Sequence, residues 1–458
     1  MNTKYSNIPI SQSDSEDSQL MTAITAPNAS TAPKALNLKT VLIITYYWPP
    51  SGGAGVQRWL KFAKYLPGHG WKPVVLTVDP LYAAYPVTDD TLARDIPETT
   101  EVIRTKAVDW FRLLKRGKSK VPTAGFANDS NDSLKNKIIR FTRGNLFIPD
   151  PRRGWNGYAY KEACRLIVKH DIKHVITTSP PHSTQLVGLR LKKRFPSIKW
   201  IVDLRDPWTD IYYYNKFYHT LPARLIDSCY EKTVLKKADR IITVGRTLEK
   251  SFIDKVPGIK GKTIVLTNGF DPDDFRTFQS KNPESLTIVY TGTLSEMYPV
   301  DGFLSAIAKR KSKGLATRFR MVGIIPVAIR QKITGILGNE NCDFIGYCSH
   351  EDSLGFLEDA SALLLIIPDH KSNGSIITGK LFEYLATGKP VICLGPAEGD
   401  ASEILNETKQ GKNFSYDDKD GIELYLENLP AGLVSGKMTA EKYSRNFLTG
   451  LLSEVLET

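Results

Sequence analysis

The sequence predicts an α/β protein built from two Rossmann-like domains that face each other across a cleft. Two observations support this prediction. Short continuous apolar runs, typical of strands buried on both faces, alternate with stretches whose apolar residues recur at helical spacing. The alternation occurs as two successive series, at residues 38–275 and 276–435. Two α/β series in one chain place a cleft between the domains that they form.

The composition is that of a soluble globular protein with an excess of basic residues. Of 458 residues, 41% are hydrophobic and 24% are charged, and the formal net charge is +12. Such a charge favours an anionic partner, which is a nucleic acid, a phosphorylated small molecule or an acidic membrane surface. We expect no nucleic-acid partner, because no nucleic-acid-binding motif accompanies the charge.

The cysteines and the apolar runs indicate a cytoplasmic location. The five cysteines form no C-x-x-C pair, and their odd number argues against a complete disulfide framework. No segment reaches the roughly 18 apolar residues of a membrane span. Residues 1–37 are rich in Ser, Thr, Asn and Ala and lack the build of a signal peptide, so we expect a disordered tail.

The first series opens with a predicted βαβ unit, made of strands at residues 40–45 and 73–77 and a helix between them. The loop before the helix contains Gly52, Gly53 and Gly55, a spacing that differs from the G-x-G-x-x-G dinucleotide fingerprint. A glycine backbone can approach a ligand closely at a helix N-terminus. The alternative is a tight turn without a ligand.

The strand predicted at residues 200–204 ends in charged residues. Asp203, Arg205 and Asp206 place three charges at the carboxyl edge of the sheet, where open α/β proteins usually carry their active sites. Upstream, His182 lies in a Pro-rich loop, where it is a site candidate or simply bonds a backbone group. The aromatic run that begins at Trp208 could stack on sugars, lie at a lipid interface or pack under a loop.

Residues 110–153 mix basic and apolar side chains. This mixture suits attachment to an anionic membrane surface. A solvated insertion explains it equally well, because a run of charges is commonly a wet face. The remaining expected elements are strands at 175–178, 239–244, 263–267, 287–291, 318–322, 343–345 and 362–367, a linker at 272–284, a helix that ends at about residue 195, and helices at 222–237, 302–311 and 353–359.

The stretch 378–390 predicts a short helix followed by a buried strand. Thr378 suits the N-cap and Gly379 allows close backbone approach, while Gly388 suits a left-handed C-cap. An apolar side at helical spacing predicts a core face, and Lys380, Glu383 and Thr387 predict a polar face.

The polar face of this helix fits a sugar nucleotide. Its N-terminal amides and Lys380 suit a phosphate, and Glu383, one turn deeper, could accept hydrogen bonds from a sugar diol. The alternative is an ordinary βαβ helix with surface charges.

Five motifs follow one another along the chain: Ser179-Pro-Pro, Asp203-Leu-Arg-Asp-x-Trp208, Asn268-Gly-Phe-Asp271, Tyr290-Thr-Gly292 and Gly379-Lys-Leu-Phe-Glu-Tyr-Leu-Ala-x-Gly-Lys-Pro390. In this order and spacing they resemble glycosyltransferase family 4 proteins of the GT-B type, especially bacterial enzymes that build surface polysaccharides. The resemblance implies an acceptor domain at 38–275, a nucleotide-sugar-binding domain at 276–435, and a C-terminal helix at 436–458 that packs back on the first domain.

The family implies metal-independent, anomer-retaining transfer of a sugar from a nucleoside diphosphate-sugar, without a cofactor, to a polysaccharide, lipid-linked or other glycan acceptor. By position, Glu383 matches the carboxylate that holds the donor ribose, and Lys380 lies at the diphosphate-binding helix start. The implied donor-binding residues are Gly52, Gly53, Gly292, Thr293, Ser375, Thr378, Gly379, Lys380 and Glu383. The implied catalytic residues are Arg205, Asp206 and Lys380, and the implied acceptor-side residues are His182 and Trp208.

Three positions depart from the family pattern. Ser375 replaces the first glutamate of an E-x7-E pair, Thr293 replaces a phosphate-binding arginine, and Tyr298 lies near the place of a lysine. Because the leaving diphosphate needs positive charge, Lys380 and Arg205 must supply more of it. Two alternatives stay open: a non-catalytic partner subunit that lost these cations, and a nucleotide-sugar epimerase of the same fold.

Overall fold

A computed structural model describes residues 38–109, 134–281, 285–295, 297–429 and 440–458. The predicted disordered tail at residues 1–37 therefore lies outside the described residues, as does the first half of the basic and aromatic region, residues 110–133. Residues 38–458 form one compact unit by their internal contacts.

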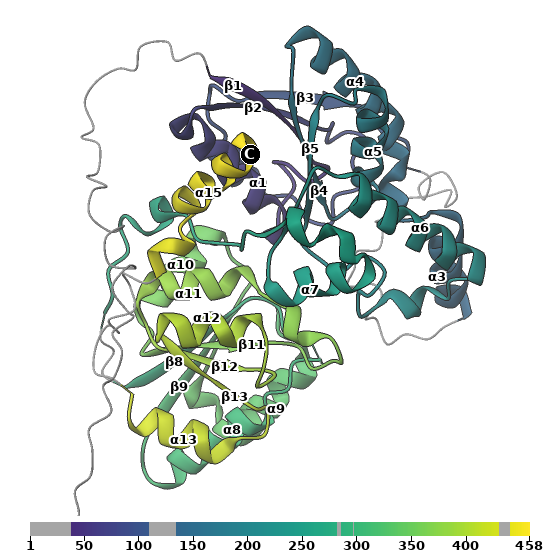
Figure 1. The fold of residues 1–458 in the computed structure, drawn as a ribbon. Helices are drawn as coiled ribbons and strands as arrows, with labels where there is room; N and C mark the ends of the chain where they lie inside the picture. The colour runs from purple at the N-terminus through teal and green to yellow at the C-terminus, as the bar shows by residue number, and fades with distance from the viewer. Residues whose placement is uncertain (1–37, 110–133, 282–284, 296, 430–439) are drawn as a thin grey trace, which may run out of the picture. The chain divides into compact units, whose positions relative to one another are not determined.

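The first half of this unit contains a seven-stranded sheet in the order β3-β2-β1-β4-β5-β6-β7 (Figure 1). All six pairs of neighbouring strands are parallel. Its strands are β1 (Lys39–Ile44), β2 (Trp71–Val78), β3 (Glu101–Thr105), β4 (His174–Ser179), β5 (Lys199–Leu204), β6 (Arg240–Thr243) and β7 (Thr263–Val265).

The second half contains a six-stranded sheet in the order β10-β9-β8-β11-β12-β13, again with parallel neighbours. Its strands are β8 (Leu286–Thr291), β9 (Thr317–Val322), β10 (Cys342–Gly346), β11 (Ala362–Ile366), β12 (Val391–Leu394) and β13 (Gly411–Phe414). In both sheets the chain starts at a central strand, runs to one edge and returns to continue on the other side, which is Rossmann-like topology. The predicted α/β fold class is thus confirmed.

Helices connect the strands and cover the sheets (Figure 1). No helix among the described residues is both long and apolar enough to cross a membrane. The α-helices are α1 (Ala54–Tyr65), α3 (Leu134–Leu146), α4 (Asn156–Lys169), α5 (Thr184–Arg194), α6 (Leu221–Lys237), α7 (Arg246–Lys255), α8 (Asp301–Ser312), α9 (Val327–Leu337), α10 (His350–Glu358), α11 (Gly379–Thr387), α12 (Asp400–Thr408), α13 (Lys419–Glu427) and α15 (Arg445–Glu457). The short 3-10 helices that matter below are η4 (Pro151–Trp155), η5 (Tyr214–Phe217) and η7 (Pro272–Phe275).

Two strands are absent from the elements expected from sequence. Both β3 and β13 lie at an edge of a sheet and are only partly buried. An edge strand has less apolar surface to cover, so its sequence lacks the continuous apolar run that identifies central strands.

The C-terminal helix α15 packs on the layer of the first sheet that contains α1 (Figure 1). Leu448, Leu452 and Leu456 share one apolar core with Trp59 of α1. The indole of Trp71 also donates a hydrogen bond to the Ser453 hydroxyl over 3.1 Å. The last helix of the chain therefore completes the core of the first sheet.

The described part of the expected linker, residues 272–281, is bound to helix α1 at its N-terminal end. It begins with η7, and Asp271 just before η7 receives hydrogen bonds from Lys64 at 2.6 Å and Tyr65 at 2.5 Å. Lys61, nearly buried, forms ion pairs with Asp271 at 2.7 Å and Asp274 at 3.1 Å. The segment is therefore anchored on α1.

Candidate functional site

Two adjoining cavities lie beside the carboxyl ends of the strands. The α11 cavity, with a volume of about 620 Å³, is bordered by the N-terminal half of α11. The aromatic cavity, with a volume of about 580 Å³, is bordered by the aromatic run after β5. The residues that line both cavities are Pro180, Arg205, Asp206, Ile377 and Thr378.

The α11 cavity lies where the strand order of the second sheet reverses. Gly292 follows β8, and α11 follows β11, which pairs with β8. Loops at such a switch point separate and leave a crevice for a ligand. From the first half of the chain, Gly53, Arg205 and Asp206 line the same cavity.

Helix α11 forms as its sequence predicts, with two differences. It begins at Gly379 and ends at Gly388, whose φ of 74° is the expected left-handed cap. Thr378 occupies the N-cap position but makes no capping hydrogen bond, and its buried hydroxyl has no partner within the described residues. Thr387 is buried rather than on a polar face, because its hydroxyl bonds the carbonyl of Tyr384 at 2.6 Å.

Lys380 lies at the N-terminus of α11 and is held by Tyr290. Its ammonium donates a hydrogen bond to the Tyr290 hydroxyl at 3.0 Å and lies 4.4 Å from the centre of that ring. Burial lowers the pKa of Lys380 to about 8. Gly292 has φ of 115°, a backbone conformation that favours glycine, and the end of the Lys380 side chain packs against it.

Glu383 lies one turn further along α11 and is paired with His350 of α10. His350 Nε2 and Glu383 Oε1 are 3.1 Å apart. Burial disfavours the carboxylate, but the hydrogen bond and charge of His350 outweigh it and hold the pKa of Glu383 below its usual value. Burial also disfavours the charged form of the His350 imidazole. The hydrogen bond and the charge of Glu383 outweigh the effect of burial and raise the pKa of His350. The cavity therefore contains an ionised carboxylate about one helical turn from an amine.

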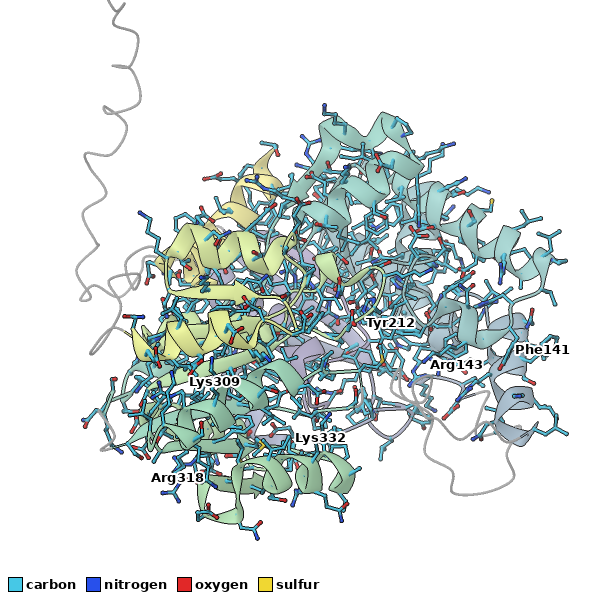
Figure 2. All side chains as sticks on the ribbon, turned by 90° about the horizontal axis from the view of Figure 1, so that it is seen from below. Phe141, Arg143, Tyr212, Lys309, Arg318 and Lys332 are labelled. Atoms are coloured by element: carbon cyan, nitrogen blue, oxygen red, sulfur yellow. The ribbon has the colours of Figure 1, made fainter. Side chains whose placement is uncertain are left out.

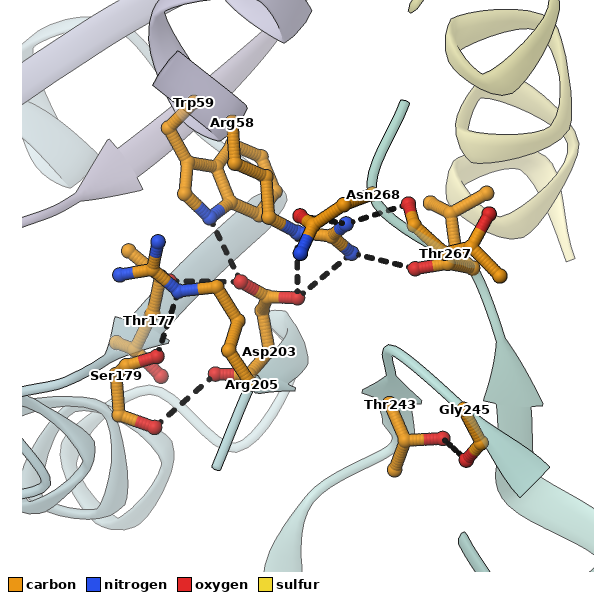
Figure 3. A network of polar contacts seen from close by, with 12 residues as sticks. Arg58, Trp59, Thr177, Ser179, Asp203, Arg205, Thr243, Gly245, Thr267 and Asn268 are labelled. Atoms are coloured by element: carbon orange, nitrogen blue, oxygen red, sulfur yellow. Dashed lines mark hydrogen bonds and ion pairs between the residues drawn. The ribbon is translucent and has the colours of Figure 1, made fainter. Parts of the chain in front are cut away.

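Arg205 and Asp206 lie between the two cavities. The Arg205 guanidinium donates to the carbonyl of Ser179 at 2.8 Å (Figure 3). It also donates to the carbonyl of Gly55 at 2.6 Å, so it joins the end of β4 to the first turn of α1. Carbonyls accept its hydrogen bonds without cancelling its charge. Burial raises the pKa of Asp206, although the charge of Arg205 acts in the opposite direction.

Asp203, three residues before Asp206, has a structural role that sequence reasoning missed. Its carboxylate accepts hydrogen bonds from Arg58 at 3.0 Å and from the indole of Trp59 at 2.8 Å, and the side chains of Arg58 and Asp203 are fully buried (Figure 3). Arg58 also donates to the carbonyl of Thr267 at 2.7 Å. This network fixes α1, β5 and the turn after β7 at the edge where the site lies.

The aromatic cavity contains both residues expected on the acceptor side. His182 stacks on Trp208 with ring centres 4.9 Å apart, and burial lowers the pKa of His182 to about 3, so it is neutral. The indole of Trp208 donates to Asp227 at 2.8 Å. Burial raises the pKa of Asp227 to about 6. Tyrosines at 47 and 212–214 and Phe217 form much of the remaining wall.

The structure brings together most of the predicted site residues, but not all. Gly53, Gly292, Gly379, Lys380 and Glu383 line the α11 cavity with Arg205 and Asp206.

Three predicted donor-binding residues lie elsewhere. Ser375 lines the aromatic cavity. Gly52 is buried against Asp89, and Thr293 is exposed and accepts a hydrogen bond from Tyr290 through its carbonyl at 3.0 Å. Within the described part of the chain, neither Gly52 nor Thr293 lines either cavity, and no cluster of three or more His, Cys, Asp or Glu side chains could hold a metal ion.

Comparison with known proteins identifies the fold. No family model matches the chain, and no curated protein matches it in sequence. A glycosyltransferase from Rickettsia africae superposes with a TM-score of 0.58 at 14% identity, over 92% of this chain and 100% of that one. HepE from Anabaena, in complex with UDP, superposes with a TM-score of 0.58 at 12% identity, over 92% and 100%. The lipopolysaccharide outer core galactosyltransferase WaaB gives 0.55 at 10% identity, over 92% and 99%.

Proposed function

From the GT-B fold that the chain shares with these structures, we propose that it transfers a sugar from a nucleoside diphosphate-sugar to a polysaccharide, lipid-linked or other glycan acceptor. The observation that carries the proposal is the N-terminus of α11, where Lys380 and Glu383 lie one turn apart in a single cavity. The HepE structures that contain UDP or UDP-glucose support a nucleotide-sugar as the donor class.

The α11 cavity suits a nucleoside diphosphate. The free amides at the start of α11 and the ammonium of Lys380 favour the diphosphate, which is doubly anionic or more. The Thr378 hydroxyl, buried without a partner in the described part of the chain, is a further donor at this end. Glu383, which is ionised, accepts hydrogen bonds from the ribose hydroxyls.

The aromatic cavity suits the acceptor, because it adjoins the α11 cavity at Arg205 and Asp206. A carboxylate with a raised pKa is a stronger base. We therefore propose that Asp206 accepts the proton of the acceptor hydroxyl that attacks the donor sugar. Retention of the anomeric configuration and independence from metal follow from the resemblance to family 4. Independence from metal is supported by Lys380, the α11 amides and Arg205, which supply positive charge to the leaving diphosphate.

Nucleotide binding and donor turnover test this proposal. We expect one or more of UDP, GDP, ADP and dTDP to raise the melting temperature, since a ligand that binds only the folded state stabilises it. We also expect the matching nucleotide-sugar to be hydrolysed slowly, equally with and without EDTA. Binding of donors without any turnover would favour a non-catalytic subunit. Release of an altered sugar without an acceptor would favour the epimerase, and binding of no nucleotide would contradict all three functions.

Attachment to a membrane is proposed from an exposed apolar surface on α3 and α6. Asn145 of α3 accepts a hydrogen bond from the backbone N–H of Thr220, just before α6, at 2.7 Å, so the two helices are neighbours. The exposed apolar residues of this surface are Leu134, Ile138, Phe141, Leu146, Leu221, Leu225 and Ile226. The expected basic contacts need correction: Arg140 and Arg152 are buried, whereas Arg153 is exposed.

The double variant Ile138→Asp/Phe141→Asp is expected to bind anionic phosphatidylglycerol vesicles at least about tenfold more weakly than wild type. Each apolar side chain that enters lipid contributes on the order of 1.5–3 kcal/mol, and aspartate reverses this. The measurement is vesicle co-sedimentation at low salt. Val168→Asp, at an equally exposed apolar position on α4, is the control. If wild type does not sediment with the vesicles, the surface does not bind membrane.

A further inference from the structure

Three arginines line the aromatic cavity, and the proposed reaction uses only Arg205. Arg143 comes from α3 and Arg152 from η4. The guanidinium of Arg143 lies 4.6 Å from the centre of the Phe217 ring. Figure 2 shows Phe141 on the outer side of α3 and Arg143 on the side toward Tyr212, which lines the same cavity.

Arg152 is buried with part of its hydrogen-bonding capacity unused. Its side chain donates to the carbonyl of Ala84 at 3.3 Å, and the residue is 8% exposed. The Nε of Arg152 is buried and has no hydrogen-bond partner within the described residues. A guanidinium N–H without an acceptor is costly in a buried position. The described residues therefore provide no hydrogen-bond acceptor for the Nε–H of Arg152.

The charges of the two arginines act on each other. Burial lowers the pKa of Arg143 to about 10, and the positive charge of Arg152 adds to this effect. Burial also disfavours the charged form of Arg152, but Tyr47, Tyr46 and Asp150 outweigh it and raise the pKa of Arg152, so this arginine keeps its charge. Two cations at the wall of one partly buried cavity repel each other, and an anion placed between them would relieve the repulsion. The arrangement therefore favours an anionic ligand over a neutral one.

Four carboxylates line the same cavity; Asp206 is the proposed base, and the other three already have hydrogen-bond or ion-pair partners. Asp150 accepts from the backbone N–H of Arg152 at 2.9 Å and from the N–H and hydroxyl of Ser183, both at 2.8 Å. Asp227 accepts from Trp208 and Tyr214, and Asp210 pairs with Lys255 at 2.9 Å. These bonds fix the carboxylates on other donors and leave the Nε of Arg152 for a ligand.

We propose that the acceptor is a saccharide with a phosphate or carboxylate group that binds to Arg143 and Arg152, which deepens the function proposed above and rests on it. Guanidinium groups bind both anions through paired, charge-assisted hydrogen bonds. The tyrosines and Phe217 of the wall suit stacking on sugar rings. A volume of about 580 Å³ is within the range of pockets that hold such ligands.

This arrangement selects the acceptor by charge. The anionic group lies at the arginines, while the attacking hydroxyl lies at Asp206, where the two cavities adjoin. A hydroxyl of a neutral saccharide could accept a hydrogen bond from the Nε of Arg152, but it would not offset the positive charge of the arginines, whereas an anion does so and forms the stronger, charge-assisted hydrogen bond. Arg143 and Arg152 are therefore specificity-determining residues.

The test uses full-length protein saturated with the nucleoside diphosphate that raises the melting temperature of wild type, so that the α11 cavity is filled and cannot bind the probe. The probes for calorimetry are glucose, glucose 6-phosphate and glucuronic acid, together with a short-chain lipid-linked sugar phosphate. We expect at least one anionic probe to bind about tenfold or more tightly than glucose, the scale of a hydrogen bond to a charged group. A preference for the lipid-linked probe alone assigns the anion to a lipid carrier and supports the proposal.

Two variants and a control locate the anion. Arg143→Gln and Arg152→Lys, each checked by thermal melting, are expected to lose most of the preference for the anionic probe. Arg153→Gln is the matched control, because Arg153 is exposed and does not line the cavity within the described residues. Equal affinity for glucose and every anionic probe overturns the proposal, as does full anion binding in both variants. Failure of wild type to bind any of UDP, GDP, ADP and dTDP instead contradicts the proposed function itself.

Discussion

Lys380→Ala is expected to lower kcat by about a hundred- to a thousandfold, the usual cost of losing one donor aimed at developing charge. Among the motif residues that line the α11 cavity, Lys380 contributes the ammonium beside the helix N-terminus. The charge of the leaving diphosphate increases in the transition state, so the loss falls on kcat more than on KM. Release of nucleoside diphosphate in the steady state measures both constants.

Lys371→Ala is the control for this variant, because Lys371 is exposed in the loop before α11.

The pH dependence of wild type provides a second check. Since burial lowers the pKa of Lys380 to about 8, its ammonium is charged below pH 8 and loses its proton above it. We therefore expect kcat/KM to fall as the pH rises through about 8. Lys380→Arg stays charged and should lack this fall; an identical fall in that variant would assign it to another group.

The α11 stretch is predictable because its signals are local. The C-cap at Gly388 and the spacing of Lys380 and Glu383 lie within one short segment, and the structure places all three as expected. Helix periodicity fixes which side chains share a face without reference to the rest of the chain. The burial of Thr387 is the exception, because a hydroxyl can satisfy itself on its own helix.

The partner of Glu383 is not predictable in the same way. The sequence predicts the preceding helix from residue 353, whereas α10 begins at His350. Its cap explains the difference: the Ser349 hydroxyl accepts a hydrogen bond from the backbone N–H of Asp352 at 3.1 Å. This Ser-x-x-Asp pattern is a capping signal that would have extended the helix to His350. That His350 then meets Glu383 depends on tertiary packing.

The roles of the charged residues at the end of β5 and in α3 also depend on tertiary structure. Asp203 and Asp206 look alike in sequence, yet the Asp203 carboxylate accepts a hydrogen bond from Arg58, which lies 145 residues away along the chain. Helix α3 is amphipathic, but the sequence does not say which face is outward. Phe141 is exposed, in agreement with the expected mixed surface, whereas Arg143 lines the cavity.

Glu383→Gln is expected to weaken binding of the nucleoside diphosphate by about 1.5–3 kcal/mol, the scale of a hydrogen bond to a charged group. The loss corresponds to roughly ten- to a hundredfold in Kd. An amide presents one acceptor and one donor group where the carboxylate presents two acceptors, so it cannot receive both ribose hydroxyls equally. Calorimetric titration of the nucleotide that stabilises wild type measures the change.

The pairing of Glu383 with His350 separates this role from a purely structural one. A 2′,3′-dideoxy nucleotide lacks the hydroxyls that Glu383 would bind, so wild type and Glu383→Gln should bind it with equal affinity if the ribose is the target. A structural role would weaken both nucleotides alike. Glu351→Gln is the matched control, since Glu351 is exposed on the first turn of α10 and adjacent to His350. Unchanged affinity of Glu383→Gln for the complete nucleotide would remove Glu383 from the donor site and leave the His350 ion pair as its only role.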